Sequence, residues 1–472
     1  MLLSLALGLW GVRRGGSMWR DEAVTYDMTH RELGALWQTL GSYDAVHGLY
    51  YLAMKGVFAL CSAPVVSPVL GDADPLLVLR LPSVLSMAAA AAGVALLGRR
   101  LAGPRAGLLA GVVFALLPPV QRFAQEGRSY AMVCALVVWA TYALVRAVGA
   151  RRRRGPWVAY AAIMLTACLL HEFAVLALPA HGLAVGRAAR RPWVLAASAV
   201  IAGTAPLAVV SQGQSAQVSW LESSSLTAGS AGLIALGIGC AGFLARVPRR
   251  GGQGTGAGEL ALPVGLLVLP TLILLLASVV KPLYVDRYVL YGQAGLALLV
   301  GAALDRAARG TRPRAVAVAV TGGAVVLALL PFSAQSRTPQ SRIDDATAVA
   351  RAVREAGAPG DGVLYTPLRR RAWTLPHASV TAGLSDLALA RDPAASHTLY
   401  GTEVSAGVLR ARMLERDRIV VAGDPTAPAP GSADASGLEA VKRDTLDAHF
   451  EACRTWRPRG ARVTLYARPG QC

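Results

Sequence analysis

Long apolar runs alternate with short polar segments over the first two-thirds of the chain. The runs approach the roughly 20 residues that a helix needs to cross a bilayer. Because backbone polar groups in lipid must be satisfied within their own segment, we expect each run to be a helix. The pattern therefore predicts an α-helical polytopic membrane protein, with its clearest apolar runs at Leu81–Leu97, Ala106–Val120, Tyr130–Val148, Val194–Ser211, Leu260–Val280 and Tyr288–Leu304.

Arginine clusters separate many of these runs, and the loops between the clusters hold few basic residues. Cytoplasmic loops of membrane proteins carry an excess of Lys and Arg, so we expect the clusters to be cytoplasmic. Counting outward from them predicts about eleven transmembrane helices, an internal N-terminus and an external tail. The clusters are Arg99, Arg100 and Arg105; Arg146 and Arg151–Arg154; Arg187, Arg190 and Arg191; Arg246, Arg249 and Arg250; and Arg306, Arg309, Arg312 and Arg314.

Composition agrees with a membrane location. The chain has 472 residues, of which 54% are hydrophobic and 16% are charged, whereas soluble domains carry about a quarter charged residues. A net charge of +19 would also suit a nucleic-acid partner, but the arginines lie between apolar runs and form no continuous basic face, so we expect no nucleic acid. The excess of Ala, Gly, Val and Arg over Lys is typical of a GC-rich bacterium.

We divide the chain into four regions. Residues 1–12 are too short for a comfortable span, and they lack the basic n-region and the cleavage site of a signal peptide. We therefore expect a first transmembrane helix that is shortened by a misassigned start codon. Residues 13–79 would form the first extracytoplasmic loop, with a juxtamembrane helix at Gly48–Leu60. Residues 80–333 would form the transmembrane bundle, and residues 334–472 a small extracytoplasmic α/β domain.

The expected tail domain alternates helix and strand signals. Ile343–Glu355 has helical periodicity, and Asp344 and Asp345 in its first turn would suit the helix dipole. Short apolar runs predict strands at Gly362–Thr366, Arg418–Ala422 and Arg462–Ala467, with a loop at Ala427–Gly437. Cys453 and Cys472 both fall in this region, and they could pair or stay free.

The first candidate for chemistry is the segment Ser17–Tyr26. It places adjacent acids Asp21 and Glu22 beside Trp19, just outside the first helix. A carboxylate partly shielded by aromatic rings near a membrane can hold a raised pKa and act as a general base. An ordinary acidic loop at an aromatic interface is the alternative.

Four more polar segments fall on the same predicted side of the membrane. Asp44 and His47 are three residues apart and would share a helical face, as metal or phosphate ligands or simply in a solvated turn. His171 and Glu172 form an ionisable pair within an apolar stretch, or a turn at the outer surface. Guanidinium and ammonium groups at outer helix ends would bind a phosphate or anchor the helix; these are Arg128, Lys281 and Arg287.

The order of these motifs resembles that of the GT-C glycosyltransferases. The motifs are Trp-x-Asp-Glu-Ala, Asp-x-x-His-Gly-Leu-Tyr-Tyr, Arg-Leu-Pro-Ser, Glu-Gly-Arg-Ser-Tyr-Ala and Asp-Arg-Tyr-Val-Leu. Closest is glycosyltransferase family 39, the dolichyl- or polyprenyl-phosphate-mannose protein mannosyltransferases, with their bacterial relatives that modify lipid A. The resemblance covers roughly residues 1–335, and the tail fits the extracytoplasmic domain that many members carry.

The resemblance implies roles for single residues. Asp21 would be the first-loop acid that deprotonates the acceptor hydroxyl, with Glu22 beside it, and Arg128 and Arg287 would bind phosphate. His47 and His171 fall where relatives place donor or metal contacts. The family usually has proline after this histidine, and Gly48 in its place puts a divalent metal in doubt, so no cofactor is certain.

The expected activity is therefore an inverting transfer of a hexose, with mannose as the first expectation, from a polyprenyl-phosphate donor to an acceptor hydroxyl outside the cytoplasm. The acceptor stays open between protein, glycan and lipid. The alternatives are a lipid or polysaccharide transporter or flippase, which would favour inverted repeats and charges at the bilayer midplane, and a scaffold whose tail binds a partner. No nucleotide-binding loop is evident, and Gly251–Gly256 is better explained as a flexible cytoplasmic loop.

Overall fold

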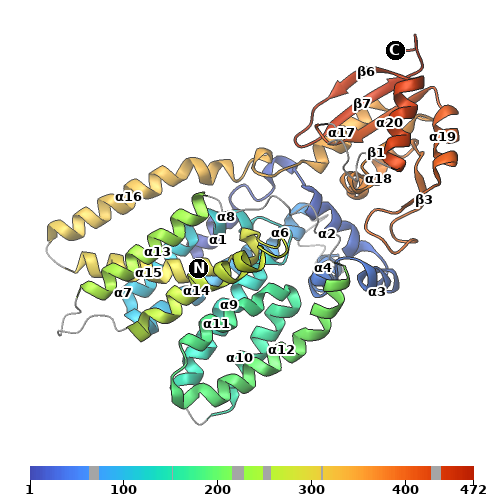
Figure 1. The fold of residues 1–472 in the computed structure, drawn as a ribbon. Coiled ribbons are helices and arrows are strands. Elements are labelled where there is room, and N and C mark those ends of the chain that lie inside the picture. Colours follow the sequence, from blue (N-terminus) through green and yellow to red (C-terminus); the bar gives the residue numbers. More distant parts are fainter. Residues whose placement is uncertain (63–73, 151–152, 215–227, 248–256, 310–311, 427–436) are drawn as a thin grey trace. The chain divides into compact units, whose positions relative to one another are not determined.

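The computed structural model describes residues 1–62, 74–150, 153–214, 228–247, 257–309, 312–426 and 437–472 (Figure 1). The chain divides into two compact units, which we describe separately. The first, the helical unit, combines Met1–Val12, Ala45–Tyr50 and Arg80–Ser336. The second, the mixed unit, combines Arg13–Asp44, Tyr51–Leu79 and Arg337–Cys472, so that much of the predicted first loop belongs to the same unit as the tail.

The helical unit is a bundle in which all six predicted apolar runs are helical over most of their length, although α14 ends at Ala277 and α15 begins only at Gly292. One run bends: Ala106–Val120 was expected as a single helix, but α7 and α8 meet at 63°. Leu117 between them is extended because it precedes Pro118, which disfavours helical backbone before it. The helices are α1 (Leu2–Leu9), α6 (Pro75–Ala102), α7 (Pro104–Leu116), α8 (Pro118–Ala124), α9 (Tyr130–Gly149), α10 (Gly155–Leu170), α11 (Ala177–Leu183), α12 (Arg190–Gly213), α13 (Ala228–Arg246), α14 (Ala257–Ala277), α15 (Gly292–Ala308) and α16 (Arg312–Gln335).

Within the described residues, six helices are long and apolar enough to cross a membrane, or seven if the bent pair α7 and α8 is one span. Three apolar helices are shorter: Ala45–Cys61, Gly155–Leu170 and Glu172–Leu183. A multi-pass membrane protein is therefore confirmed. The count of about eleven spans stays a prediction.

Small residues let α6, α7 and α15 pack closely. A Cβ added to Gly107 would lie 2.4 Å from the carbonyl oxygen of Ala95, and one on Gly301 would lie 2.5 Å from the backbone nitrogen of Ala110. Close backbone approach at glycine and alanine is typical of helices packed within membranes. This close packing holds α6, α7 and α15 together.

The mixed unit combines helices from two distant parts of the sequence with a five-stranded sheet of order β2-β1-β5-β7-β6. Strands β2, β1 and β5 run parallel, whereas β7 pairs antiparallel with both β5 and β6. A separate short antiparallel pair, β3 (Leu389–Arg391) and β4 (Thr402–Glu403), comes between β2 and β5 in the sequence. The helices of this unit and the strands of its larger sheet have the following bounds: α2 (Arg20–His30), α3 (Leu33–Ser42), α4 (Gly48–Cys61), α17 (Ala346–Ala356), β1 (Gly362–Thr366), α18 (Ala378–Thr381), β2 (Ser385–Asp386), α19 (Ala406–Leu414), β5 (Arg418–Gly423), α20 (Leu438–His449), β6 (Glu451–Trp456) and β7 (Arg462–Ala467).

The three predicted strands are confirmed as β1, β5 and β7, and the predicted helix as α17. The expected first turn is wrong in detail, because α17 begins at Ala346 and Asp345 is its N-cap, accepting a 3.0 Å hydrogen bond from the backbone of Ala348. Asp344 therefore precedes the helix. Most of the predicted loops at Ala427–Gly437 and Gly251–Gly256 lie outside the described residues.

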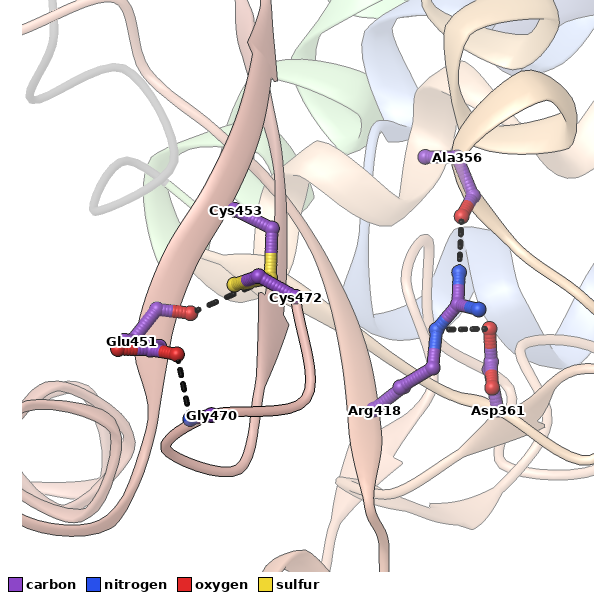
Figure 2. The surroundings of a disulfide bond; sticks show 7 residues. All are labelled: Ala356, Asp361, Arg418, Glu451, Cys453, Gly470 and Cys472. Carbon is purple, nitrogen blue, oxygen red and sulfur yellow. Dashed lines mark hydrogen bonds and ion pairs between the residues drawn. A yellow bond between two sulfur atoms is a disulfide. The ribbon is translucent and has the colours of Figure 1, made fainter.

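Cys453 and Cys472 form a disulfide bond (Figure 2). It joins β6 to the end of the described chain, where the backbone N–H of Gly470 also donates a 2.7 Å hydrogen bond to Glu451. Disulfides persist in oxidising compartments. The bond therefore agrees with the predicted external tail.

Candidate functional site

The predicted acids Asp21 and Glu22 lie in the first turn of α2, in the mixed unit. The helix begins at Arg20 because Trp19 has extended backbone. Glu22 accepts a 2.6 Å hydrogen bond from Arg14 and a 3.4 Å bond from the backbone N–H of Trp19, which is half of a capping box. The side chains of Arg14 and Glu22 are both 0% exposed. Glu22 thus fixes the preceding loop to the helix.

Asp21 has a different environment from its neighbour. Its carboxylate is 17% exposed and lies 3.8 Å from the Nε atom of Arg20, too far for a hydrogen bond. It also sits at the helix N-terminus, where backbone N–H groups favour a negative charge. Of the two predicted acids, Asp21 is therefore the one that a reacting group can reach.

A third carboxylate, Asp344, belongs to the same cluster, although the sequence offered no sign of this. Its oxygens accept hydrogen bonds from the backbone N–H of Arg20 at 2.9 Å and from Nε1 of Trp373 at 3.1 Å. Burial raises the pKa of Asp344; the charge of Arg20 opposes this rise and that of Asp21 adds to it. The tail segment before α17 therefore braces the start of α2.

Two tail arginines extend this cluster. Arg369 and Arg370, in a 3₁₀ helix at Leu368–Trp373, both form ion pairs with Asp424. The guanidinium of Arg370 stacks 4.9 Å from the ring of Trp373. Burial lowers the pKa of Arg370, and the nearby positive charges of Arg20 and Arg369 lower it further. Arg370 therefore lies close enough to Arg20, the residue before Asp21, for their charges to interact.

The helical unit brings the other predicted residues together. The guanidinium of Arg128 lies 3.2 Å from Nε2 of His47, and all three of Arg128, His47 and His171 are buried. The rings of His47 and His171 are 5.6 Å apart. Arg128 stands just before α9, His47 ends a 3₁₀ turn and His171 ends α10, so three separate chain segments meet here.

Two tyrosines and Arg287 complete this group. We name it the His–Arg cluster and define it by His47, Arg128, Tyr130, His171, Arg287 and Tyr288. The guanidinium of Arg287 lies 5.4 Å from the ring centroid of Tyr130 and 5.7 Å from that of Tyr288. The ring of His171 is 5.6 Å from Tyr130 and 4.6 Å from Tyr288. The cluster combines two guanidinium groups with aromatic walls, which suits a phosphate attached to an apolar group.

Sequence reasoning did not single out Tyr130 and Tyr288, although both lie in the quoted motifs. Each stands within two positions of a predicted arginine. The Arg-Leu-Pro-Ser motif also has a structural part: Arg80 donates a 2.7 Å hydrogen bond to the carbonyl of Val12, and Ser83 donates one of 2.6 Å to the carbonyl of Glu126. The bond from Ser83 fixes the turn that carries Arg128.

Three predicted residues lie elsewhere. Glu172 accepts a 2.6 Å hydrogen bond from Ser211 of α12. Lys281 is exposed in the turn after α14. Asp44 has a left-handed backbone (φ 57°) and accepts a hydrogen bond from the hydroxyl of Tyr51. It precedes the 3₁₀ turn that ends at His47, so the expectation that these two share a helical face is wrong.

The proposed metal role finds no matching set of donors. Among the residues that the structure describes, no group of three or more His, Cys, Asp or Glu side chains could hold a metal ion. His47 faces a guanidinium, which repels a cation.

Comparison with known families gives a match over part of the chain. The sequence model of the family described as dolichyl-phosphate-mannose-protein mannosyltransferase matches residues 67–213. This range holds Arg128 and His171. No curated protein matches the sequence.

Comparison with solved structures shows the fold. ArnT from Cupriavidus metallidurans, solved bound to undecaprenyl phosphate, is 12% identical with a TM-score of 0.54, over 98% of this chain and 96% of that one. The oligosaccharyltransferase of Archaeoglobus fulgidus, in complex with zinc and sulfate, is 12% identical with a TM-score of 0.52, over 99% of this chain and 73% of its own. Both are GT-C glycosyltransferases. The predicted GT-C fold is therefore confirmed.

Proposed function

We propose, from this GT-C fold and from the matched family, that the chain transfers a sugar from a polyprenyl-phosphate donor to an acceptor hydroxyl at the extracytoplasmic face of the membrane. The His–Arg cluster is the observation that carries the proposal. Arg128 and Arg287 come from segments far apart in the sequence. Arg128 contacts His47 and Arg287 contacts Tyr130, and the Tyr130 ring lies against both histidines. Arg128 is buried and Arg287 is half-buried, and ionisable side chains inside a membrane bundle commonly mark a functional site.

In this proposal the arginines bind the donor. Arg128 and Arg287 would hold the phosphate oxygens, and Tyr130 and Tyr288 would flank the sugar or the first isoprene unit. Negative charge grows on the leaving phosphate as its bond to the sugar breaks. Guanidinium groups fixed in place beforehand therefore stabilise the transition state more than the ground state.

Asp21 supplies the base. The acceptor hydroxyl oxygen attacks C1 of the sugar, its proton passes to the Asp21 carboxylate, and the C1–O bond to phosphate breaks, releasing polyprenyl phosphate. Attack opposite the leaving group inverts the anomeric centre. Glu22, buried against Arg14, would position Asp21 through the first turn of α2 and would not exchange protons itself.

The donor class follows the neighbours of the fold. ArnT was solved with undecaprenyl phosphate, and the archaeal oligosaccharyltransferase AglB, with a TM-score of 0.50, in complex with an inhibitory peptide and a dolichol-phosphate. The matched family is named for mannose transfer. Mannose is therefore the first sugar to test, and a protein hydroxyl the first acceptor.

The test separates a transferase from a flippase. Membranes expressing the chain are given polyprenyl phosphates carrying radiolabelled mannose, glucose or an aminosugar. A transferase moves label from lipid to a non-lipid or second lipid product and releases polyprenyl phosphate in equal amount. Movement of intact donor across the bilayer, with no released polyprenyl phosphate for any sugar, would contradict the proposal and support the flippase.

A further inference from the structure

A cavity of about 490 Å³ lies within the helical unit, where α6, α13 and α15 end and α16 begins. It is distinct from the His–Arg cluster. Arg287 and Tyr288 precede α15, whereas the cavity is lined by residues at its far end, such as Arg306 and Arg309. A helix of 17 residues separates these ends by about 25 Å.

The charged wall of the cavity is strongly basic. Arg306, Arg309 and Arg314 line it, against one carboxylate, Asp305. Arg309 forms a 2.5 Å ion pair with Asp305, whose side chain is buried. Among the described residues that line the cavity, arginines therefore outnumber carboxylates by three to one.

One of these arginines is fixed by the backbone. Arg306 donates hydrogen bonds of 2.8 and 2.9 Å to the carbonyls of Leu244 and Val247, at the end of α13. These are carbonyls that have no partner within their own helix. The bonds hold the guanidinium at the cavity wall.

The rest of the wall is apolar. Phe243 and Val318 line the cavity, and α16 continues from it with large exposed apolar side chains that include Val316, Val320 and Leu327. A spanning helix with such a face is covered by acyl chains. The site thus offers guanidinium groups beside an apolar path, a combination that suits an amphiphile with an anionic head.

We propose that this cavity binds the headgroup phosphate of an anionic phospholipid, with the acyl chains along α16. Guanidinium groups recognise phosphate oxygens in pairs, and basic pockets between membrane helices on the cytoplasmic side bind anionic headgroups. The arginine pattern predicts that this end of the bundle is cytoplasmic. The inference stands independently of the proposed sugar transfer.

The test compares two arginines at the start of α16. Arg314 lines the cavity and Arg312 does not, yet both are exposed and either can be replaced with little effect on folding. Purified full-length wild type, Arg314→Gln and Arg312→Gln are titrated with phosphatidylglycerol in detergent, and bound lipid is counted by native mass spectrometry. We expect Arg314→Gln to bind about fivefold more weakly and Arg312→Gln to bind as wild type does.

Two further titrations identify the chemistry. Phosphatidylcholine should bind more weakly to wild type and equally to both variants, because its headgroup carries no net charge. Glycerol 3-phosphate at millimolar concentration should not displace phosphatidylglycerol. Equal affinities of the two variants for phosphatidylglycerol would overturn the inference, and so would full displacement by glycerol 3-phosphate, which would indicate a site for soluble phosphates.

Discussion

The guanidinium of Arg128 lies 3.2 Å from Nε2 of His47, although the two residues are 81 positions apart in the sequence. The pair therefore presents a guanidinium and an imidazole to the same space. That arrangement suits an anionic ligand and disfavours a metal ion.

Arg128→Gln tests the donor role of this pair. Loss of a charge-assisted hydrogen bond to phosphate should lower kcat/KM for the lipid donor about 10- to 100-fold. Both KM and kcat should change, because the arginine contacts the donor in the ground state and stabilises the leaving phosphate further in the transition state. Steady-state kinetics with varied donor measures this change. Arg122→Gln, at an exposed arginine of α8, is the matched control. Equal losses in both variants would show that the effect is not local.

The buried ion pair of Arg14 and Glu22 should be structural. Arg14→Met or Glu22→Met leaves one buried charge without its partner and should lower the free energy of unfolding by about 3–5 kcal/mol. The double variant removes both charges and should recover most of that loss. Chemical unfolding followed by tryptophan fluorescence checks this. A double variant that is less stable than either single one would contradict the account.

The disulfide Cys453–Cys472 should stabilise the mixed unit by about 3 kcal/mol, because it closes a loop of 19 positions in the unfolded chain. Cys453→Ser with Cys472→Ser should therefore lower the unfolding midpoint. Cys61→Ser, at a free cysteine of the same unit, is the control for loss of a thiol. Reducing agent should lower the midpoint of wild type and leave the double variant unchanged.

His377 should give the mixed unit a dependence on pH. Burial lowers the pKa of its imidazole from the ordinary 6.5; Asp345 opposes this and Arg354 adds to it. As the pH falls below about 6.5 the unfolded chain takes up this proton before the folded one does, so folding stability falls. His377→Gln should therefore lose less stability than wild type between pH 7.5 and 5.5. Thermal unfolding at both pH values measures the difference, with His449→Gln as the control.

The sequence predicted the apolar helices well, because the backbone of a long apolar run in a membrane must satisfy its own hydrogen bonds. It also identified Arg128, His47, His171 and Arg287, since charged residues beside apolar runs are conspicuous. Their meeting in one cluster was expected only through the resemblance to a family. Pattern alone carries no information about which segments become neighbours.

The misses have a physical reason as well. Asp344 bonds to the backbone of Arg20, 324 positions away, and no local signal encodes such a contact. Asp21 and Glu22 look alike in the sequence, and only burial against Arg14 separates them. The edge strand β6 was missed because its side chains are mostly exposed, which removes the apolar alternation that predicts strands.

The most direct test of the central claim is the loss of transfer on removing the proposed base. Membranes with wild type, Asp21→Asn and Glu32→Gln, an exposed acid of the same unit, are given the radiolabelled donor that wild type uses best. The account predicts that Asp21→Asn folds normally, binds the donor and transfers at least 1,000-fold more slowly, on the order of the loss expected for a general base, while Glu32→Gln keeps full activity. Wild-type rates from a correctly folded Asp21→Asn would contradict it.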